Sequence, residues 1–434
     1  MSEASVHDPR PVSAVSAGVG WAGMAGLALW VLFSRHHGLI GPYAAMAAVA
    51  ACGVPMIGWS LLVDRVHRNP STGVDWDRQP RSLSESFDIS LVKLTGLWAT
   101  WAIIATLYCV GRWYWRGQYL FAMEVMGAAI PVVLLLSIPY IIWIDRRLSE
   151  PRDGAYAFGR FLLNLGPPDR DALQEHLRSW AVKGFFTAFM ISIVPGNFAD
   201  VVRPAVSEIL MNPVTLARWL IGAMFLVDVA FATVGYLMTL RPLDAHIRSA
   251  NPYAAGWMAA LICYPPFLLM ADGGPLDYHP GTQDWVAWMN GHPVLLTVTG
   301  IALVLLTGLY AWATVAFGLR FSNLTNRGIL THGPYRWSKH PAYLAKNLYW
   351  WLATLPFLAT TGNFTDMVRN SIILAMINGV YYWRARTEER HLMADPAYRA
   401  YAEWMDRNAP LPRLIRWFRG SPAAVKPVSA DQQT

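Results

Sequence analysis

Charged residues are scarce in this chain. They make up 15% of its 434 residues, whereas a soluble domain carries about 25%. Hydrophobic residues reach 54% and are gathered in long runs. This composition excludes an ordinary soluble fold and makes lipid the expected solvent for most of the surface. The 21 Trp and 18 Tyr, many of them near the ends of the runs, are typical of interfacial aromatic belts.

Cysteine and cofactor fingerprints are also scarce. The three cysteines, Cys52, Cys109 and Cys263, lie in or beside apolar runs and form no metal-ligand spacing, so we expect buried small side chains and no metal site. Neither of the two polar segments near the C-terminus holds a glycine-rich fingerprint followed by a strand and a helix, so no Rossmann domain is indicated. The net charge of +7 comes largely from loops between apolar runs. It therefore indicates membrane topology and argues against a nucleic-acid partner.

The apolar runs predict an all-α, polytopic membrane bundle of about ten transmembrane helices. The predicted spans are roughly 14–34, 40–63, 91–110, 120–144, 183–202, 215–240, 254–271, 294–318, 343–361 and 367–386. Pro195-Gly196 interrupts the fifth span, and Pro265-Pro266 is expected to kink the seventh. The stretch 169–180 reads as an amphipathic helix on the membrane surface.

The loops between these spans differ in charge. Arginines gather in 64–90, 145–182, 241–248 and 319–342, whereas 272–293 contains neither Lys nor Arg. The positive-inside rule then puts both termini and the 319–342 loop in the cytoplasm, most simply across a bacterial inner membrane. An even number of helices is required for this arrangement, in agreement with the ten predicted spans.

Two polar segments near the C-terminus contain the residues best suited to chemistry. One runs from Arg320 into the ninth span, and the other follows the tenth span from Arg384 onward. A helical hairpin formed by these two spans brings both segments to one membrane face. Together they offer flexible glycines, aromatic rings, a histidine and paired acids and bases, which suit a ligand with an adenine ring, a ribose and a zwitterionic tail. The alternative is structural, because basic residues after membrane helices commonly act only as topology determinants.

The residues in these segments follow a recognisable order. The chain reads Gly-Pro-Tyr-Arg, then Lys-His-Pro-Ala-Tyr, and later Glu-Glu-x-x-Leu and Tyr-x-x-Tyr. This pattern resembles the isoprenylcysteine carboxyl methyltransferase and phospholipid N-methyltransferase superfamily over about the last 120 residues. The matching residues are Gly333, Tyr335, His340, Pro341, Tyr343, Glu388, Glu389, Leu392, Tyr398 and Tyr401, with Arg327-Gly328-Ile329 similar to the family's lead-in.

The resemblance implies an S-adenosylmethionine-dependent methyltransferase that acts on a lipid or a lipid-linked small molecule. The acceptor is left open among a carboxylate, an amine and a hydroxyl, and the oligomeric state is also left open. The implied cofactor-binding residues are Gly333, Tyr335, His340, Pro341, Tyr343, Glu388 and Glu389. Arg384, Arg386 and Lys339 are the candidates for placing an anionic acceptor, with phospholipid headgroup binding as their alternative role. A structural cap is the alternative role for His340.

Some positions depart from the family pattern. Lys339 stands where the family usually has Arg. The positive charge is kept, but the two parallel N–H donors with which a guanidinium can bind a carboxylate are lost. Ala345 stands where Gly is common, followed by Lys346, and Asp395 occupies the usual Phe-Gly stretch.

A second hypothesis for the function is an NADPH-dependent enzyme resembling the sterol reductases. A third is a non-catalytic transporter or lipid-binding protein, which discontinuous helices at Pro195-Gly196 and Pro265-Pro266 would favour.

The predicted organisation has three parts. Residues 1–290 form an N-terminal membrane region of seven helices with no assigned role, 291–420 a methyltransferase-like domain of three helices with a cytoplasmic cofactor site, and 421–434 a disordered tail. Glu124, Asp228 and Lys346 lie at membrane depth. Because a charge in lipid costs several kcal/mol, we expect them to face the interior, where the two acids line a cavity or form ion pairs. Lys346 has the further option of snorkelling to the interface.

Overall fold

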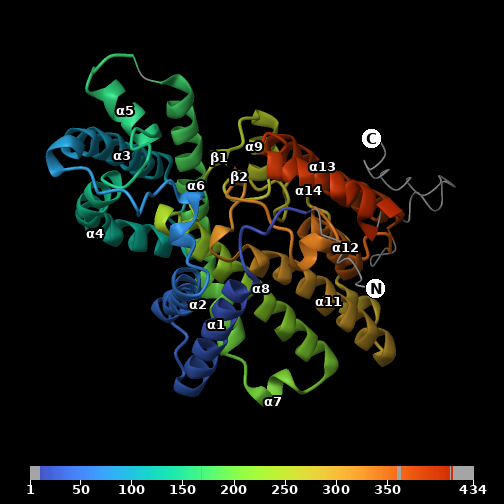
Figure 1. The fold of residues 1–434 in the computed structure, drawn as a ribbon. Coiled ribbons are helices and arrows are strands. Elements are labelled where there is room, and N and C mark those ends of the chain that lie inside the picture. Colours follow the sequence, from blue (N-terminus) through green and yellow to red (C-terminus); the bar gives the residue numbers. More distant parts are fainter. Residues whose placement is uncertain (1–9, 168, 359–362, 411, 414–434) are drawn as a thin grey trace, which may run out of the picture.

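Long helices dominate the computed structural model (Figure 1), which describes residues 10–167, 169–358, 363–410 and 412–413. Seven of the described helices are long and apolar enough to cross a membrane. They are α1 (Ala17–His37), α2 (Pro42–Leu62), α3 (Leu83–Gly111), α4 (Leu120–Asp145), α6 (Arg170–Val202), α8 (Pro213–Leu237) and α11 (Pro293–Phe317). The predicted all-α polytopic membrane fold is confirmed at this level, whereas a count of ten spans is not.

Shorter and more polar elements complete the fold. The remaining α-helices are α5 (Gly154–Leu162), α7 (Val206–Ile209), α9 (Ala254–Leu261), α10 (Trp285–Trp288), α12 (Pro341–Thr354), α13 (Phe364–Leu392) and α14 (Pro396–Asn408). Short 3-10 turns occupy Val66–Arg68, Pro70–Thr72, Gly117–Tyr119, Arg241–Leu243, Gly318–Arg320 and Gly333–Arg336. Two short strands, β1 (Ser249–Ala250) and β2 (Thr325–Asn326), pair antiparallel and join the N-terminal region to the loop after α11.

The seventh predicted span, 254–271, is wrong. The helix in this part of the chain, α9, ends at Leu261, and turns rich in Pro and Gly follow it as far as α10. Apolar side chains of this irregular segment, such as Met270 and Tyr278, pack against Ile373 and Ile377 of α13. Irregular backbone is tolerated at membrane depth where protein covers it, which an apolar run alone does not reveal.

One further predicted span and the predicted surface helix have different bounds. The helix predicted over 343–361 is α12, which ends at Thr354 because Leu355 adopts a left-handed conformation with φ of 48°. Its length of about 21 Å is less than the roughly 30 Å of a hydrocarbon core. The stretch 169–180 is not a separate surface helix, since it forms the first turns of α6, and this helix continues through Pro195 without a break.

The outward faces of these helices are apolar, as a lipid-facing surface requires. Leu135 is 69% exposed and Leu305 67% exposed, and soluble proteins rarely expose such residues in contiguous patches. Asp228 is buried in α8, as predicted. The prediction for Glu124 is wrong, because its side chain is exposed one turn after the start of α4, where it is within reach of the membrane interface.

A buried guanidinium connects the loop after α11 with the N-terminal region. Arg327 is 3% exposed and donates to the carbonyl oxygens of Gly235 (2.8 Å), Ala245 (2.7 Å), Leu319 (2.8 Å) and Phe321 (2.8 Å). These acceptors belong to the end of α8, to the loop after it, and to the 3-10 turn after α11 together with the residue that follows this turn. One side chain thus holds three segments at the same face of the bundle.

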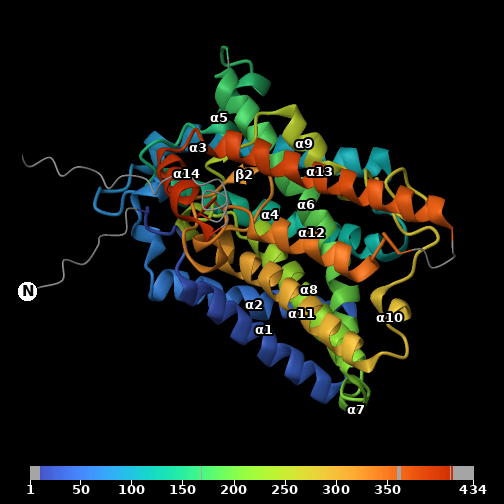
Figure 2. The same cartoon turned by 90° about the vertical axis from the view of Figure 1, so that its right-hand side faces the viewer.

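Figure 2 shows α11, α12 and α13 running beside one another from this face toward α10. The polar loops meet at the end of these helices that lies away from α10. Val74 pairs with Leu148 in an isolated antiparallel β-bridge. Asp244 accepts a hydrogen bond from Asn69 at 3.0 Å, and the backbone N–H of Ala14 donates to the carbonyl oxygen of Ile329 at 2.9 Å. The Arg-rich loops identified in the sequence therefore gather at one end of the bundle, which we call the site face.

Replacing Arg327 with Met is expected to destabilise the protein by about 3 kcal/mol, because several buried carbonyl groups lose their donor. Arg336→Met is the matched control: it lies in the same loop, is exposed, and should change stability by less than about 0.5 kcal/mol. Thermal unfolding of the detergent-purified variants measures both. Equal melting temperatures for the two variants would contradict the anchoring role of Arg327.

Candidate functional site

The two polar segments meet at the site face, as the sequence predicts. His340 Nε2 lies 3.0 Å from Glu389 Oε1, and the Tyr343 hydroxyl donates to Glu388 Oε2 at 3.0 Å. His340 precedes α12, where Pro341 begins the helix without needing a backbone donor. Both glutamates lie in the last turns of α13. The antiparallel course of α12 and α13 is the reason that residues 49 positions apart touch.

Glu389 is the centre of a small charge cluster. Lys339 Nζ lies 3.1 Å from its carboxylate, and Arg386 lies 3.2 Å away on the outer side. Burial opposes ionisation of Glu389, but the hydrogen bond with His340 and the charge of Lys339 outweigh it and lower the pKa to about 2. Lys339 also contacts Asp406 of α14 at 3.0 Å. This cluster therefore holds the loop, α13 and α14 together as charged partners.

Arg384 occupies a different environment from Arg386. It is 6% exposed, and its guanidinium carbon lies 5.2 Å from the ring centre of Tyr343 and 5.1 Å from that of Tyr381. Its guanidinium donates a hydrogen bond to Asn323 Oδ1 at 3.2 Å, which is a neutral acceptor. Aromatic faces attract a cation without neutralising it. Arg384 therefore keeps its positive charge available to a ligand.

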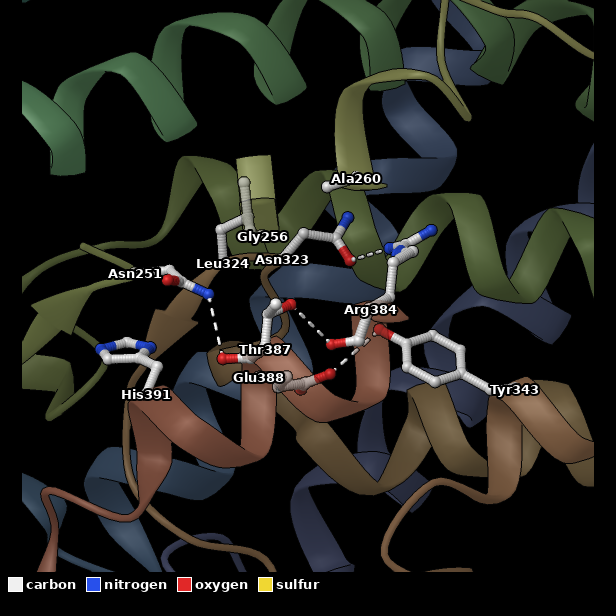
Figure 3. Close-up of a pocket in the computed structure, with 10 residues that line it drawn as sticks. All are labelled: Asn251, Gly256, Ala260, Asn323, Leu324, Tyr343, Arg384, Thr387, Glu388 and His391. Atoms are coloured by element: carbon white, nitrogen blue, oxygen red, sulfur yellow. Dashed lines mark hydrogen bonds between the residues drawn. The ribbon is translucent and has the colours of Figure 1, made fainter. Parts of the chain in front are cut away.

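An open cavity lies between α11, the 321–343 loop, α12 and α13, and its free space of about 660 Å³ includes space that is open to solvent. Its walls include the predicted residues Tyr335, Lys339, His340, Tyr343, Arg384 and Glu388. A smaller hollow of about 330 Å³ lies on the α9 side of Arg384 (Figure 3) and shares Asn323, Tyr343, Arg384 and Glu388 with it.

Helix α14 closes the site face over the loop. The Tyr401 hydroxyl donates to the Tyr335 carbonyl at 2.6 Å. Tyr401 and Tyr398 are buried with Ile329 and Met405 in one apolar cluster. The Tyr-x-x-Tyr pair therefore fastens α14 onto the loop, and neither of these two side chains lines the described cavities.

The predicted site residues thus separate into two groups. Gly333, Pro341, Glu389 and Arg386 do not line the cavities found among the described residues. Gly333 has φ of +58°, and an added Cβ would lie 3.3 Å from Trp312 Nε1, so its role is to let the loop turn close to α11. Arg386 has a side chain 60% exposed, which turns it away from the cavity that Arg384 faces.

Several lining residues were missed from the sequence. They are Tyr264, Tyr310, Thr314, Phe317, Phe321, Ser322, Asn323, Ala342, Lys346 and Tyr381 in the larger cavity. Lys346 does not snorkel to the interface, since its ammonium lies 4.7 Å from the ring centre of Tyr310 inside the protein. The unusual charge at membrane depth was the available signal for Lys346. Tyr264 gave no such signal, because it is an uncharged residue in a segment predicted as a membrane helix kinked at Pro265-Pro266.

A separate polar group lies in the loop after α9. Asp272, Asp277 and His279 are close enough for their ligand atoms to share an ion. The two carboxylate oxygens of Asp277 already accept from the backbone N–H groups of Gly273 and His279, at 2.8 and 3.0 Å. Loop hydrogen bonds thus account for this group, and the expected lack of a metal site stays a prediction.

Fold and site together define a helical integral membrane protein with an aromatic, charged cavity at one end of its bundle. Residues 294–394, about a quarter of the chain, match the isoprenylcysteine carboxyl methyltransferase (ICMT) family. This match confirms the resemblance drawn from the sequence motifs and supports an enzyme of the membrane methyltransferase class. Comparison with curated proteins and with solved structures gives no significant match.

Glu389→Gln is expected to remove an acid-sensitive part of the stability. A carboxyl whose pKa is lowered by folding stabilises the protein fully above its unfolded pKa near 4.5, and this contribution is lost as the pH falls toward 2. Between pH 6 and pH 3.5, the free energy of unfolding of the wild type should therefore fall by about 1.4 kcal/mol more than that of the variant. Thermal unfolding across this range measures the difference, and parallel pH profiles would refute it.

Proposed function

We propose that the protein transfers a methyl group from S-adenosylmethionine to a lipid or lipid-linked acceptor in the larger cavity. The observation that carries the proposal is the convergence of the loop 333–343 and the acidic end of α13 on one cavity, within the segment that matches the ICMT family. The acceptor reaches this cavity from the bilayer, since α11, α12 and α13 form its walls.

The residues present fit such a cofactor. Tyr335 and Tyr343 offer ring faces for an adenine, and Glu388 has a second carboxylate oxygen, Oε1, with no hydrogen bond among the described residues. That oxygen suits a ribose hydroxyl or an ammonium group. His340 stacks on Tyr343 with ring centres 5.5 Å apart, which keeps both rings at the cavity wall. When bound, S-adenosylmethionine supplies an electrophilic methyl group on a sulfonium.

The side chains of the cavity position the acceptor and exclude water. In-line displacement requires the acceptor atom close behind the methyl carbon, and orientation of this kind contributes several kcal/mol. Arg384 holds a negative or electron-rich acceptor from the α13 side, while Lys339 is bound by Glu389 and Asp406 and mainly secures the rim. Tyr264, Phe317 and Phe321 keep the reacting atoms in an apolar surrounding.

We further propose that the site face is the cytoplasmic side of a bacterial inner membrane. Arg65, Arg147, Arg241 and Arg336 belong to the loops that meet there, and the positive-inside rule favours that orientation. The described parts of both terminal segments also lie at this face: Ser13 hydrogen-bonds His332, and α14 packs on the loop.

The boundaries 1–290 and 291–420 remain our proposed division of the chain into two parts. The predicted disordered tail, 421–434, lies outside the described residues.

The competing hypotheses receive less support. The match falls in a methyltransferase family, so an NADPH-dependent reductase is not favoured. The transporter hypothesis relied on broken membrane helices. Helix α6 is continuous through Pro195 and Gly196, and Pro265-Pro266 lies in turns after α9 and not within a helix.

Calorimetry with S-adenosylhomocysteine and NADPH tests the cofactor. We expect purified protein to bind S-adenosylhomocysteine and not NADPH, because the cavity carries aromatic rings and the Glu388 carboxylate, which suit a nucleoside with a zwitterionic tail. At a hundredfold excess over Kd, the bound ligand should also stabilise the fold by about 2.7 kcal/mol. Binding of NADPH without binding of S-adenosylhomocysteine would reverse the assignment.

Two arginines on one helix test the catalytic site. Arg384→Met should lower kcat/KM for methyl transfer to an extract of cellular lipids at least a hundredfold, because it removes the buried cation that faces the cavity. Arg386→Met, on the exposed face of α13, should stay within threefold of the wild type. The release of radiolabelled methyl product measures the activity of both variants. Equal losses of kcat/KM would show that the two arginines act only through the positive charge that they give the protein surface.

A further inference from the structure

One side of α13 is held by residues from the N-terminal part of the chain. Arg384, Thr387 and His391 are spaced by three and four positions, so they lie along the same side of the helix, and all three are buried. Asn251 Nδ2 donates to the Thr387 carbonyl at 3.4 Å, and Ser249 Oγ lies 2.9 Å from His391 Nε2. These contacts set the rotation of α13 about its own axis. Arg384 is the member of the row that also lines the larger cavity.

The rotation of a helix does not by itself fix a guanidinium at the end of a long side chain. The ring centres of Tyr264, Tyr343 and Tyr381 lie 5.7, 5.2 and 5.1 Å from the guanidinium carbon of Arg384. Attraction to a ring face holds a cation with less directional preference than a hydrogen bond does. A directional contact comes from Asn323, whose Oδ1 accepts from Arg384 Nη2 at 3.2 Å (Figure 3). Asn323 is therefore placed to decide where the guanidinium points.

Two tyrosines orient the amide of Asn323. Its Nδ2 donates to the hydroxyl oxygens of Tyr236 at 3.0 Å and Tyr264 at 3.3 Å, and its backbone N–H donates to the Tyr236 hydroxyl at 2.8 Å. The other end of the amide, Oδ1, then faces the guanidinium. The reversed amide would put an NH₂ group, which only donates, against another donor. One orientation of the amide thus satisfies both of its neighbours.

Tyr236 connects this amide to the body of the N-terminal region. It lies on α8 and is buried, and its ring stacks on Phe186 of α6 with ring centres 5.2 Å apart and an interplanar angle of 10°. Tyr264 comes from the irregular segment after α9. Both tyrosines lie outside 294–394, the segment that matches the ICMT family. A line of contacts therefore runs from α6 and α8 through Asn323 to the cation in the cavity.

Building on the proposed function, we propose that Asn323 is a positioning residue for methyl transfer and that the N-terminal region acts on the reaction through it. Tyr236 and Tyr264 hold the amide, and the amide holds the Arg384 guanidinium where it faces the acceptor. The cation is thereby placed before the acceptor arrives, which lowers the cost of reaching the reactive arrangement. The N-terminal region, to which the sequence assigns no role, thus contributes to the rate.

Steady-state kinetics of Asn323→Leu tests this role. The assay follows the transfer of a radiolabelled methyl group from S-adenosylmethionine to an extract of cellular lipids by the detergent-purified full-length protein. We expect kcat to fall at least about tenfold while KM for S-adenosylmethionine stays within about threefold, because a misplaced cation affects the transition state more than cofactor binding.

Asn370→Leu is the matched control. It also removes a buried amide that contacts α13 and its surroundings, since Asn370 lies on this helix and its Nδ2 donates to the Pro280 carbonyl at 2.6 Å. Asn370 does not line the described cavities and lies 14 residues, or roughly 21 Å, before Arg384. The kcat of this variant should stay within about threefold of the wild type.

A double-mutant cycle separates positioning from a general structural effect. If Asn323 acts through Arg384, Asn323→Leu should lower kcat less than about twofold further in the Arg384→Met protein, whereas an independent structural effect would persist in full. Tyr236→Phe removes one hydroxyl and keeps the packed ring. It should lower kcat about threefold, and this loss should be absent in the Arg384→Met protein.

Two results overturn the proposal: a kcat of Asn323→Leu within threefold of the wild type, or an equal loss of kcat with and without Arg384. If Asn323→Leu does not fold, Tyr236→Phe decides, and a kcat equal to that of the wild type then overturns the proposal. Failure of the proposed function is distinguishable, since the wild type would then transfer no labelled methyl group and bind no S-adenosylhomocysteine.

Discussion

Two hydrogen bonds across the α12–α13 hairpin determine the geometry of the site. Tyr343 to Glu388 and His340 to Glu389 join the loop to the last turns of α13. Because residues four apart share one helix face, fixing Glu388 also fixes Arg384, one turn earlier. The buried cation is thereby aimed into the cavity. The same constraint leaves Arg386, two residues from Arg384, on the outer face of the helix.

The N-terminal region is part of this site and not merely an attached membrane anchor. Arg327 fastens the loop after α11 to α8 and to the loop that follows it, and β1 pairs with β2 just beside the cavity. Tyr264, from the irregular segment after α9, supplies one wall. Asp228 reaches the deep end from α8. The segment that matches the ICMT family therefore uses side chains outside its own bounds to complete its cavity.

Membrane energetics explain how polar groups persist at this depth. Hydroxyl groups satisfy Asp228, aromatic rings surround Lys346 and Arg384, and packed helices cover the turns after α9. Each arrangement avoids direct exposure of a charge or a free backbone group to lipid, which would cost several kcal/mol. Both cations line the cavity, where a ligand can reach them.

The sequence by itself determined the helical membrane class, most of the long helices and the meeting of the two polar segments, because apolar length and hairpin connection are local properties of the chain. The order of the C-terminal motifs also indicated the resemblance to the ICMT family. Only the tertiary structure decided that 254–271 is largely irregular, that Glu124 faces outward and that Lys346 faces the cavity. Helical periodicity separates Arg384 from Arg386, but which of the two faces is buried depends on how α13 packs against α9 and α12, and such long-range contacts leave no local pattern.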